Sequence, residues 1–205
     1  MAIDYSVPFT LPNHTGIAQI ELRAVNAVAY SQSPFTYAGQ AHAYSGETWQ
    51  ADITLPPMKR ADAEQWIAFL VSLRGQYGTF YLGDPSATSP RGTVSTNSDV
   101  NAATGNAGSR TISCTITSGE TLLAGDYIQI GTTSNRTLHK VLEDVTGTGS
   151  AQDVEIWPAL RESKSSAGVN ILNTTGKFRL ASNEQNWSVN EASIYGITFG
   201  AFEAI

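Results

Sequence analysis

The hydrophobic pattern of the first sixty residues predicts β-strands. Apolar side chains occupy most even positions from Ala18 to Tyr30, and this period of two is typical of a strand with one buried face. The same alternation returns from Trp49 to Leu55. Between these runs the sequence favours a turn at residues 31–34, a weaker strand at residues 35–44 and a second turn at Ser45-Gly46. The pattern therefore predicts three strands in this part of the chain.

After Pro56-Pro57 the period of the apolar residues changes to that of a helix. The prolines end the preceding strand because they have no amide hydrogen to donate to a neighbouring strand. Large apolar residues then follow the i, i+3, i+4, i+7 spacing of one helix face, and Gly75 is a natural residue to follow a helix end. A helix is predicted at about residues 60–74, with this face packed on a sheet. The residues that form the face are Trp66, Phe69, Leu70 and Leu73.

The rest of the chain predicts short strands separated by turns. Residues 86–109 are mainly small and polar, as expected of a long surface connection, and residues 163–176 form a second polar stretch. Regular turn signals between them indicate a small antiparallel barrel or sandwich. The predicted strands after the helix are residues 79–82, 111–115, 126–130, 137–142, 153–157, 178–180, 187–189 and 194–202.

The two polar stretches suggest that one β unit is inserted into another. Residues 1–87 and 176–205 would form a discontinuous β-sandwich or split-barrel core with the helix on its flank, and residues 88–175 would form the inserted β domain. The strands of the tail are aromatic, like residues 80–82, which favours this arrangement. Two sequential domains, with the tail in the second, are the alternative. The fold class is mainly β in either case.

Charge and composition exclude several classes of partner. The net charge is −6 and 15% of the residues are charged, with no basic patch, so specific nucleic-acid binding is not expected. No apolar stretch approaches the ~20 residues needed to cross a bilayer, so no membrane association is expected either.

The residue types that carry catalysis or metal binding do not form recognisable motifs. Cys114 is the only cysteine, which excludes an intrachain disulfide, and its alternating context favours a small core residue. His14, His42 and His139 show no ligand spacing, and His42 and His139 are expected at surface or half-buried strand positions. We therefore predict no catalytic, cofactor-binding or metal-binding residue, no cofactor and no enzymatic activity.

Close carboxylates and aromatic residues have structural explanations. Asp62 and Glu64 fit the positive start of the helix, and Asp153 and Glu155 fit the outward face of a strand. Glu143-Asp144 is the remaining acidic pair. The aromatic residues favour core packing, with a carbohydrate-binding β-sandwich as the alternative function. Loss of glycan binding on replacing an exposed tryptophan would distinguish that alternative. The aromatic residues concerned are Trp49, Trp157, Trp187, Tyr77, Tyr81 and Tyr195.

Six segments, which together cover about half of the chain, carry a resemblance to a known family: residues 49–66, 69–70, 73–75, 77–85, 123–131 and 178–197. In their order and length these segments resemble the distal tail protein of long-tailed siphophages, which is the adaptor at the tip of the tail tube. A related minor tail protein of the same tip complex is the alternative. The resemblance involves no catalytic signature.

The resemblance implies a role in the virion. Proteins of this family form a ring, usually of six copies, that continues the lumen of the tail tube and contacts the tube protein on one side. The tail hub or receptor-binding apparatus lies on the other side, and the tape-measure protein is a further partner. The resemblance therefore implies a structural protein of the phage tail tip, made in the cytoplasm of the host bacterium. Larger relatives carry a galectin-like domain after the core, whereas here the additional unit is short and precedes the last strands.

Overall fold

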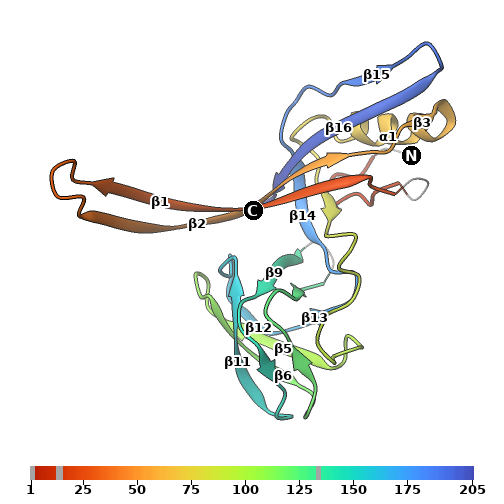
Figure 1. Ribbon diagram of the computed structural model, residues 1–205. Coiled ribbons are helices and arrows are strands. Elements are labelled where there is room, and N and C mark those ends of the chain that lie inside the picture. Colours follow the sequence, from red (N-terminus) through yellow and green to blue (C-terminus); the bar gives the residue numbers. More distant parts are fainter. Residues whose placement is uncertain (1–2, 13–15, 133–134) are drawn as a thin grey trace.

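The computed structural model describes residues 3–12, 16–132 and 135–205, and in this part of the chain it is mainly β with one helix. Figure 1 shows two sheet systems, one above the other, and a long hairpin that extends away from both. The expected mainly β fold with a single flanking helix is confirmed.

The first sheet combines the beginning and the end of the chain. Its strand order is β1-β2-β16-β14-β4, and β3 and β15 also pair with β16. Since β16 lies between β2 and β14, the last strand of the chain completes the sheet. The bounds are β1 Gln19–Gln32, β2 Gly39–Thr54, β3 Met58–Lys59, β4 Phe80–Leu82, β14 Gly176–Leu180, β15 Trp187–Val189 and β16 Ile194–Glu203.

The second sheet is built from the middle of the chain. Its strand order is β12-β5-β6-β11-β9-β8-β13, and the short strands β7 and β10 pair with each other beside it. The bounds are β5 Val100–Gly105, β6 Thr111–Ile116, β7 Thr121–Leu122, β8 Tyr127–Ile130, β9 Thr137–Val141, β10 Val145–Thr146, β11 Ala151–Trp157, β12 Lys164–Ala167 and β13 Val169–Asn170.

Some polar segments that we expected to be connections are strands. β5 lies within residues 86–109, and β12 and β13 lie within residues 163–176. Val100 and Ala103 are buried on β5, but they are three residues apart, with Asn101 and Ala102 between them, so the segment shows no alternation of period two in the sequence. Tertiary packing thus recruits weakly patterned segments into the second sheet.

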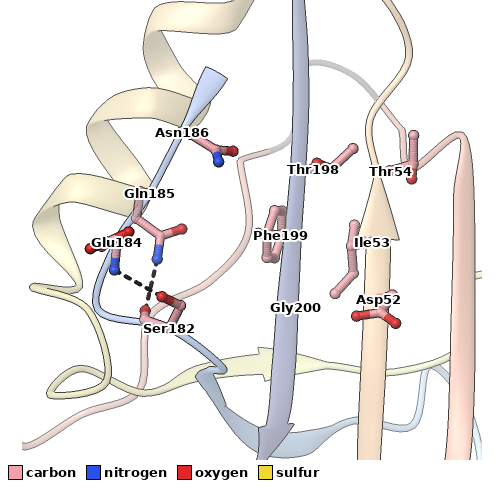
Figure 2. A pocket seen from close by; sticks show the side chains of 10 residues that line it. All are labelled: Asp52, Ile53, Thr54, Ser182, Glu184, Gln185, Asn186, Thr198, Phe199 and Gly200. Carbon is pink, nitrogen blue, oxygen red and sulfur yellow. Dashed lines mark hydrogen bonds between the residues drawn. The ribbon is translucent and has the colours of Figure 1, made fainter. Parts of the chain in front are cut away.

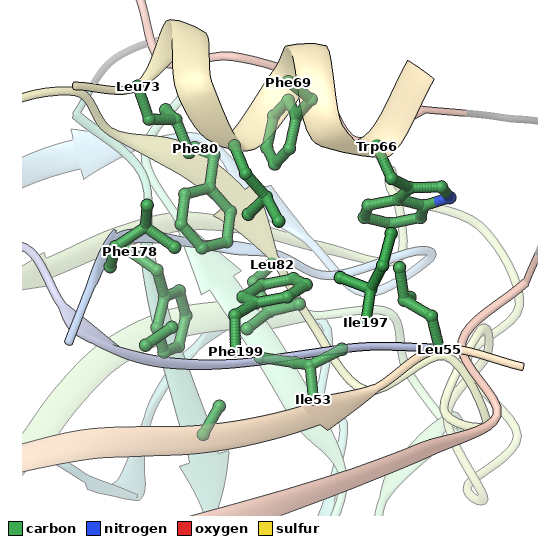
Figure 3. Packing of buried hydrophobic residues seen from close by; sticks show 14 of the residues in the cluster. Ile53, Leu55, Trp66, Phe69, Leu73, Phe80, Leu82, Phe178, Ile197 and Phe199 are labelled. Carbon is green, nitrogen blue, oxygen red and sulfur yellow. The ribbon is translucent and has the colours of Figure 1, made fainter. Parts of the chain in front are cut away.

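The helix α1 runs from Arg60 to Ser72, two residues shorter than predicted. Arg74 lies outside its last turn, with a φ of 52°, and Gly75 follows with a φ of 66°, so the chain leaves the helix through a left-handed segment. The predicted apolar face is confirmed, since Trp66, Phe69, Leu70 and Leu73 are all buried. Figure 3 shows this face directed at aromatic and aliphatic side chains of β2, β4 and β16.

Aromatic contacts hold the helix on the sheet. The Phe69 ring meets the Phe80 ring edge-on at a centroid distance of 5.7 Å, and Trp66 lies 6.2 Å from Phe199. Such contacts add to the burial of each side chain, which stabilises the fold by about 1.5–3 kcal/mol apiece. The helix therefore covers one face of the first sheet.

The two sheet systems share side chains at their seam. Tyr127 and Leu138 of the second system belong to the core of the first, and the Trp157 ring packs edge-on against Trp49 at 4.6 Å. The two chain crossings also meet, because the Asn173 amide donates to the Thr88 carbonyl at 2.9 Å. The middle segment thus leaves and rejoins the first system at neighbouring points.

Among the described residues, no helix combines the length and apolar character required to span a membrane.

Candidate functional site

The most distinctive surface of the molecule is the outer part of the hairpin formed by β1 and β2. We call residues 26–46 the arm. All of these residues are exposed except Ser33, which is half-buried. Figure 1 shows that the arm projects from the body without covering either sheet system. Both faces of this ribbon therefore meet solvent in a single copy of the chain.

The arm combines apolar exposure with a lack of charge. Residues 24–46 contain no Asp, Glu, Lys or Arg. Exposed strand edges are normally protected by such charges, above all by lysine. The large exposed side chains are Val28 at 52%, Tyr30 at 64%, Phe35 at 92%, Tyr37 at 75% and Tyr44 at 56% of their full accessibility.

The arm also offers free strand edges. In the part of the chain that is described, β1 pairs only with β2, and β16 pairs with β2 only from Gln50 to Thr54. The backbone donors and acceptors on the outer edges of the arm therefore have no partner strand. A ribbon of this kind can accept an additional strand from another chain.

Our expectation of three strands was wrong in this region. The predicted turn at Ser45-Gly46 is an irregularity within one continuous strand, β2. Asn26 pairs with Glu47, whereas Val28 already pairs with Ala43, so three residues of β2 lie opposite Ala27 alone. Such a bulge bends a ribbon and increases its twist. It marks the point where the arm leaves the sheet.

A buried carboxylate holds the arm at this point. The Glu47 side chain is 3% exposed, and its Oε1 accepts a hydrogen bond from Arg110 Nε at 2.9 Å. Its Oε2 accepts from the Ala159 amide at 2.7 Å, and its backbone carbonyl accepts from Arg161. We call this set of contacts the root of the arm.

A second buried carboxylate and a tryptophan extend the root. Glu203 Oε2 accepts from the Trp49 amide at 3.2 Å and from Arg161 Nη2 at 2.9 Å. On the other strand of the hairpin, Trp157 Nε1 donates to Asn26 Oδ1 at 2.8 Å. Residues of the second sheet system therefore form hydrogen bonds with both strands of the arm at the bulge.

Sequence reasoning missed this cluster. Glu47 and Glu203 are far apart in the chain, and each lies in a strand where an acidic residue is usually exposed. Alternation places Glu47 on the same face as the buried Trp49, but the sequence does not show that Arg110 and Ala159 cover this position.

The histidines do not form a site. His42 lies exposed on the arm, as expected, and its ring packs edge-on against Tyr44 at 4.7 Å. His139 is fully buried, so the prediction of a surface or half-buried position was wrong. Strand β9 is covered on both sides, with Leu138 in the first core and His139 facing the Pro158 carbonyl. His14 lies outside the described residues.

Cys114 and the pair Asp153 and Glu155 have the structural roles that we predicted. Cys114 is buried, and this burial, together with the nearby Asp153 carboxylate, raises the pKa of the thiol to about 11, which disfavours the nucleophilic thiolate. Asp153 and Glu155 lie exposed on β11. In residues 3–12, 16–132 and 135–205, no three His, Cys, Asp or Glu side chains come close enough to hold a metal ion.

One surface pocket near the first sheet is mainly polar. It has a volume of about 420 Å³ and lies between β2, β16 and residues 182–186. Figure 2 shows Ile53 and Phe199 on the sheet side, with Asp52 below them and Glu184 and Gln185 across the opening. Asp52 already pairs with Arg23. The pocket therefore presents no converging acid pair.

The tryptophans divide between the core and the surface. Trp49 and Trp66 are buried and Trp157 is half-buried, in agreement with core packing. Trp187 is 42% exposed on β15, so the expectation of core packing was wrong for this residue. β15 pairs on one side with β16, and the segment lies at the margin of the sheet, where nothing in the described chain covers its ring fully.

Comparison with known proteins gives no identification: no protein-family model matches the chain, and no curated protein matches it.

Proposed function

We propose that this protein is a structural component of a phage tail tip, of the distal tail protein type, and that its copies assemble into a ring through the arm. The ring would be hexameric by resemblance, and it would join the tail tube to the hub and receptor-binding apparatus. Two lines of evidence support the proposal: the resemblance over residues 49–85, and an arm suited to contact another chain.

The arm is the observation that carries the proposal. A single copy in water would expose a ribbon with unprotected edges and a row of large apolar side chains. Surfaces of this kind mark interaction sites, and in an uncovered state they promote aggregation. Contact with a neighbouring copy covers both the edges and the side chains, which gives the association a hydrophobic driving force.

The proposed partners are other copies of the chain, the tail tube protein, the hub and the tape-measure protein. The proposed location is the virion, after synthesis in the host bacterial cytoplasm. Specific nucleic-acid binding, membrane binding and catalysis form no part of the role. The net charge of −6 suits a lumen through which DNA passes without adhering.

Replacing the tip of the arm tests the proposal. We expect the wild-type chain to form a closed oligomer, measured by light scattering and native mass spectrometry. The double variant Phe35→Asp/Tyr37→Asp should be monomeric at the same concentration, because two charges at the tip oppose burial in an interface. Its far-UV circular dichroism should match that of the wild type, since the tip contacts neither core.

Val71→Asp is the matched control, because Val71 is also exposed, at 57%, but lies on α1 away from the arm. It should assemble like the wild type. A wild-type chain that stays monomeric at all concentrations and does not bind tail tube or hub protein would overturn the proposal.

A further inference from the structure

A small pocket rich in cations adjoins the root of the arm, with which it shares Arg161 and Glu203. Its volume is about 200 Å³, and it is formed where β12, β14 and the end of β16 approach the start of β9. The charged side chains in its walls are Arg136, Arg161, Lys164, Lys177, Glu162 and Glu203.

The charge of this pocket contrasts with that of the whole chain. The walls contain four of the 12 Lys and Arg residues but two of the 18 Asp and Glu residues. Counted over side chains alone, four positive and two negative groups leave a local charge of +2 in a protein whose net charge on the same count is −6. Such a concentration of cations around one small volume favours an anionic ligand.

The two carboxylates compensate these cations incompletely. Glu203 is shared, since it also accepts from the Trp49 amide. Glu162 is 72% exposed and lies 3.4 Å from Lys164 Nζ, so water screens its charge. The Lys177 side chain makes no hydrogen bond or ion pair in the part of the chain that is described, while its backbone carbonyl accepts from the Ala204 amide.

Two of the cations are held firmly in place. The side chains of Arg161 and Lys164 are only 15% and 12% exposed. Arg161 Nε is buried without an acceptor among the described residues. The positive field reaches His139, whose pKa is lowered first by burial and then by Arg161 and Lys164.

We propose that this pocket binds a small oxyanion or a carboxylate. Ammonium and guanidinium groups form strong, charge-assisted hydrogen bonds with sulfate, phosphate and carboxylate oxygens. The volume is too small for a large ligand but sufficient for one such group. The group could come from a free inorganic anion or from an acidic side chain of a partner protein, and the proposal does not depend on the function of the arm.

The test measures binding of inorganic sulfate, inorganic phosphate and N-acetylglutamate amide by calorimetry, at an ionic strength held constant with sodium chloride. We expect binding of at least one probe. Lys177→Gln and Lys164→Gln should each weaken it on the order of tenfold, because each removes a charged hydrogen-bond donor. Lys59→Gln is the control, since Lys59 is exposed outside the pocket, and it should leave binding unchanged.

The probes distinguish the sources of the ligand. Binding of sulfate or phosphate supports a free anion, whereas binding of the glutamate derivative alone supports an acidic side chain of a partner. Equal binding by the wild type and both pocket variants would overturn the site, as would the absence of binding by all three probes. Melting temperatures of the variants within a few degrees of the wild type show that the folded pocket was tested.

Discussion

At the scale of single residues, His139 shows how burial decides chemistry. Its Nδ1 lies 2.7 Å from the Pro158 carbonyl oxygen, which can only accept, so Nδ1 carries the proton. Nε2 then accepts from the Thr137 hydroxyl at 2.7 Å. Both ring nitrogens are satisfied in the neutral form. Burial lowers the pKa of His139 to about 4, and Arg161 and Lys164 contribute to the lowering.

This pKa predicts a loss of stability in acid. Below its unfolded-state pKa of 6.5, the histidine takes up a proton more readily in the unfolded chain than in the folded one. The stabilisation present above pH 6.5 should therefore fall by about 3 kcal/mol as the pH approaches 4. Urea unfolding at a series of pH values would measure it. His139→Asn keeps a donor near Nδ1 and should reduce this slope, and an unchanged slope would contradict the assignment.

The sequence predicted the burial of single residues correctly where the alternation of apolar and polar positions along a strand was enough to decide it. Cys114 alternates with Ile112 and Ile116, and all three are buried. The predicted exposure of His139 was wrong because alternation shows which face of a strand a side chain lies on, but does not show whether other parts of the chain bury that face. A second layer of structure lies over β9, and the local sequence contains no signal for it.

At the scale of elements, the hairpin takes part in two ion pairs that differ in burial: one joins it to the second sheet system and the other lies between its own strands. The Glu47–Arg110 pair involves a carboxylate that is 3% exposed, whereas both partners of the Arg23–Asp52 pair are about half exposed, at 47% and 55%. Exposed pairs contribute about 0–1 kcal/mol, while loss of one partner in a buried cluster costs several times more.

We therefore expect Glu47→Ala to lower the free energy of unfolding by about 2 kcal/mol, because it leaves the buried Ala159 amide without an acceptor and the Arg110 guanidinium without its carboxylate. Arg23→Ala should cost less than about 1 kcal/mol. Chemical denaturation of both variants measures the difference. Equal losses would show that the buried cluster does not hold the arm.

The elements themselves were only partly predictable. The helix face from Trp66 to Leu73 has a strong period and a clear end, so it was found almost to the residue. The prediction divided the hairpin wrongly because Ser45-Gly46 has the composition of a turn, yet these two residues lie unpaired opposite Ala27 in a bulge. Composition alone does not distinguish a reversal of the chain from a bend within it.

At the scale of the whole molecule, the two sheet systems are joined by side chains rather than by a flexible linker. Trp49, Tyr127 and Trp157 pack together at the seam. Each system has its own hydrophobic cluster, so the seam determines whether they unfold together.

We expect one unfolding transition for the wild type, with coincident near-UV and far-UV circular dichroism curves. Trp157→Ala removes the edge contact with Trp49 and the hydrogen bond to Asn26, and it should separate the two curves while costing about 2 kcal/mol. Trp187→Ala, which changes an exposed ring outside the seam, should leave the curves coincident. Two separate transitions in the wild type would contradict this coupling.

The sequence by itself determined the mainly β class, the single helix with its buried face, the core position of Cys114 and the charge-free run in residues 24–46, because periodicity and composition are local properties. Tertiary structure alone decided that this run stands free of the body as an arm, that Glu47 and Glu203 are buried at its root, and that four cations surround one pocket. These features depend on contacts between residues far apart in the chain, and on the register and cover that only the folded molecule defines.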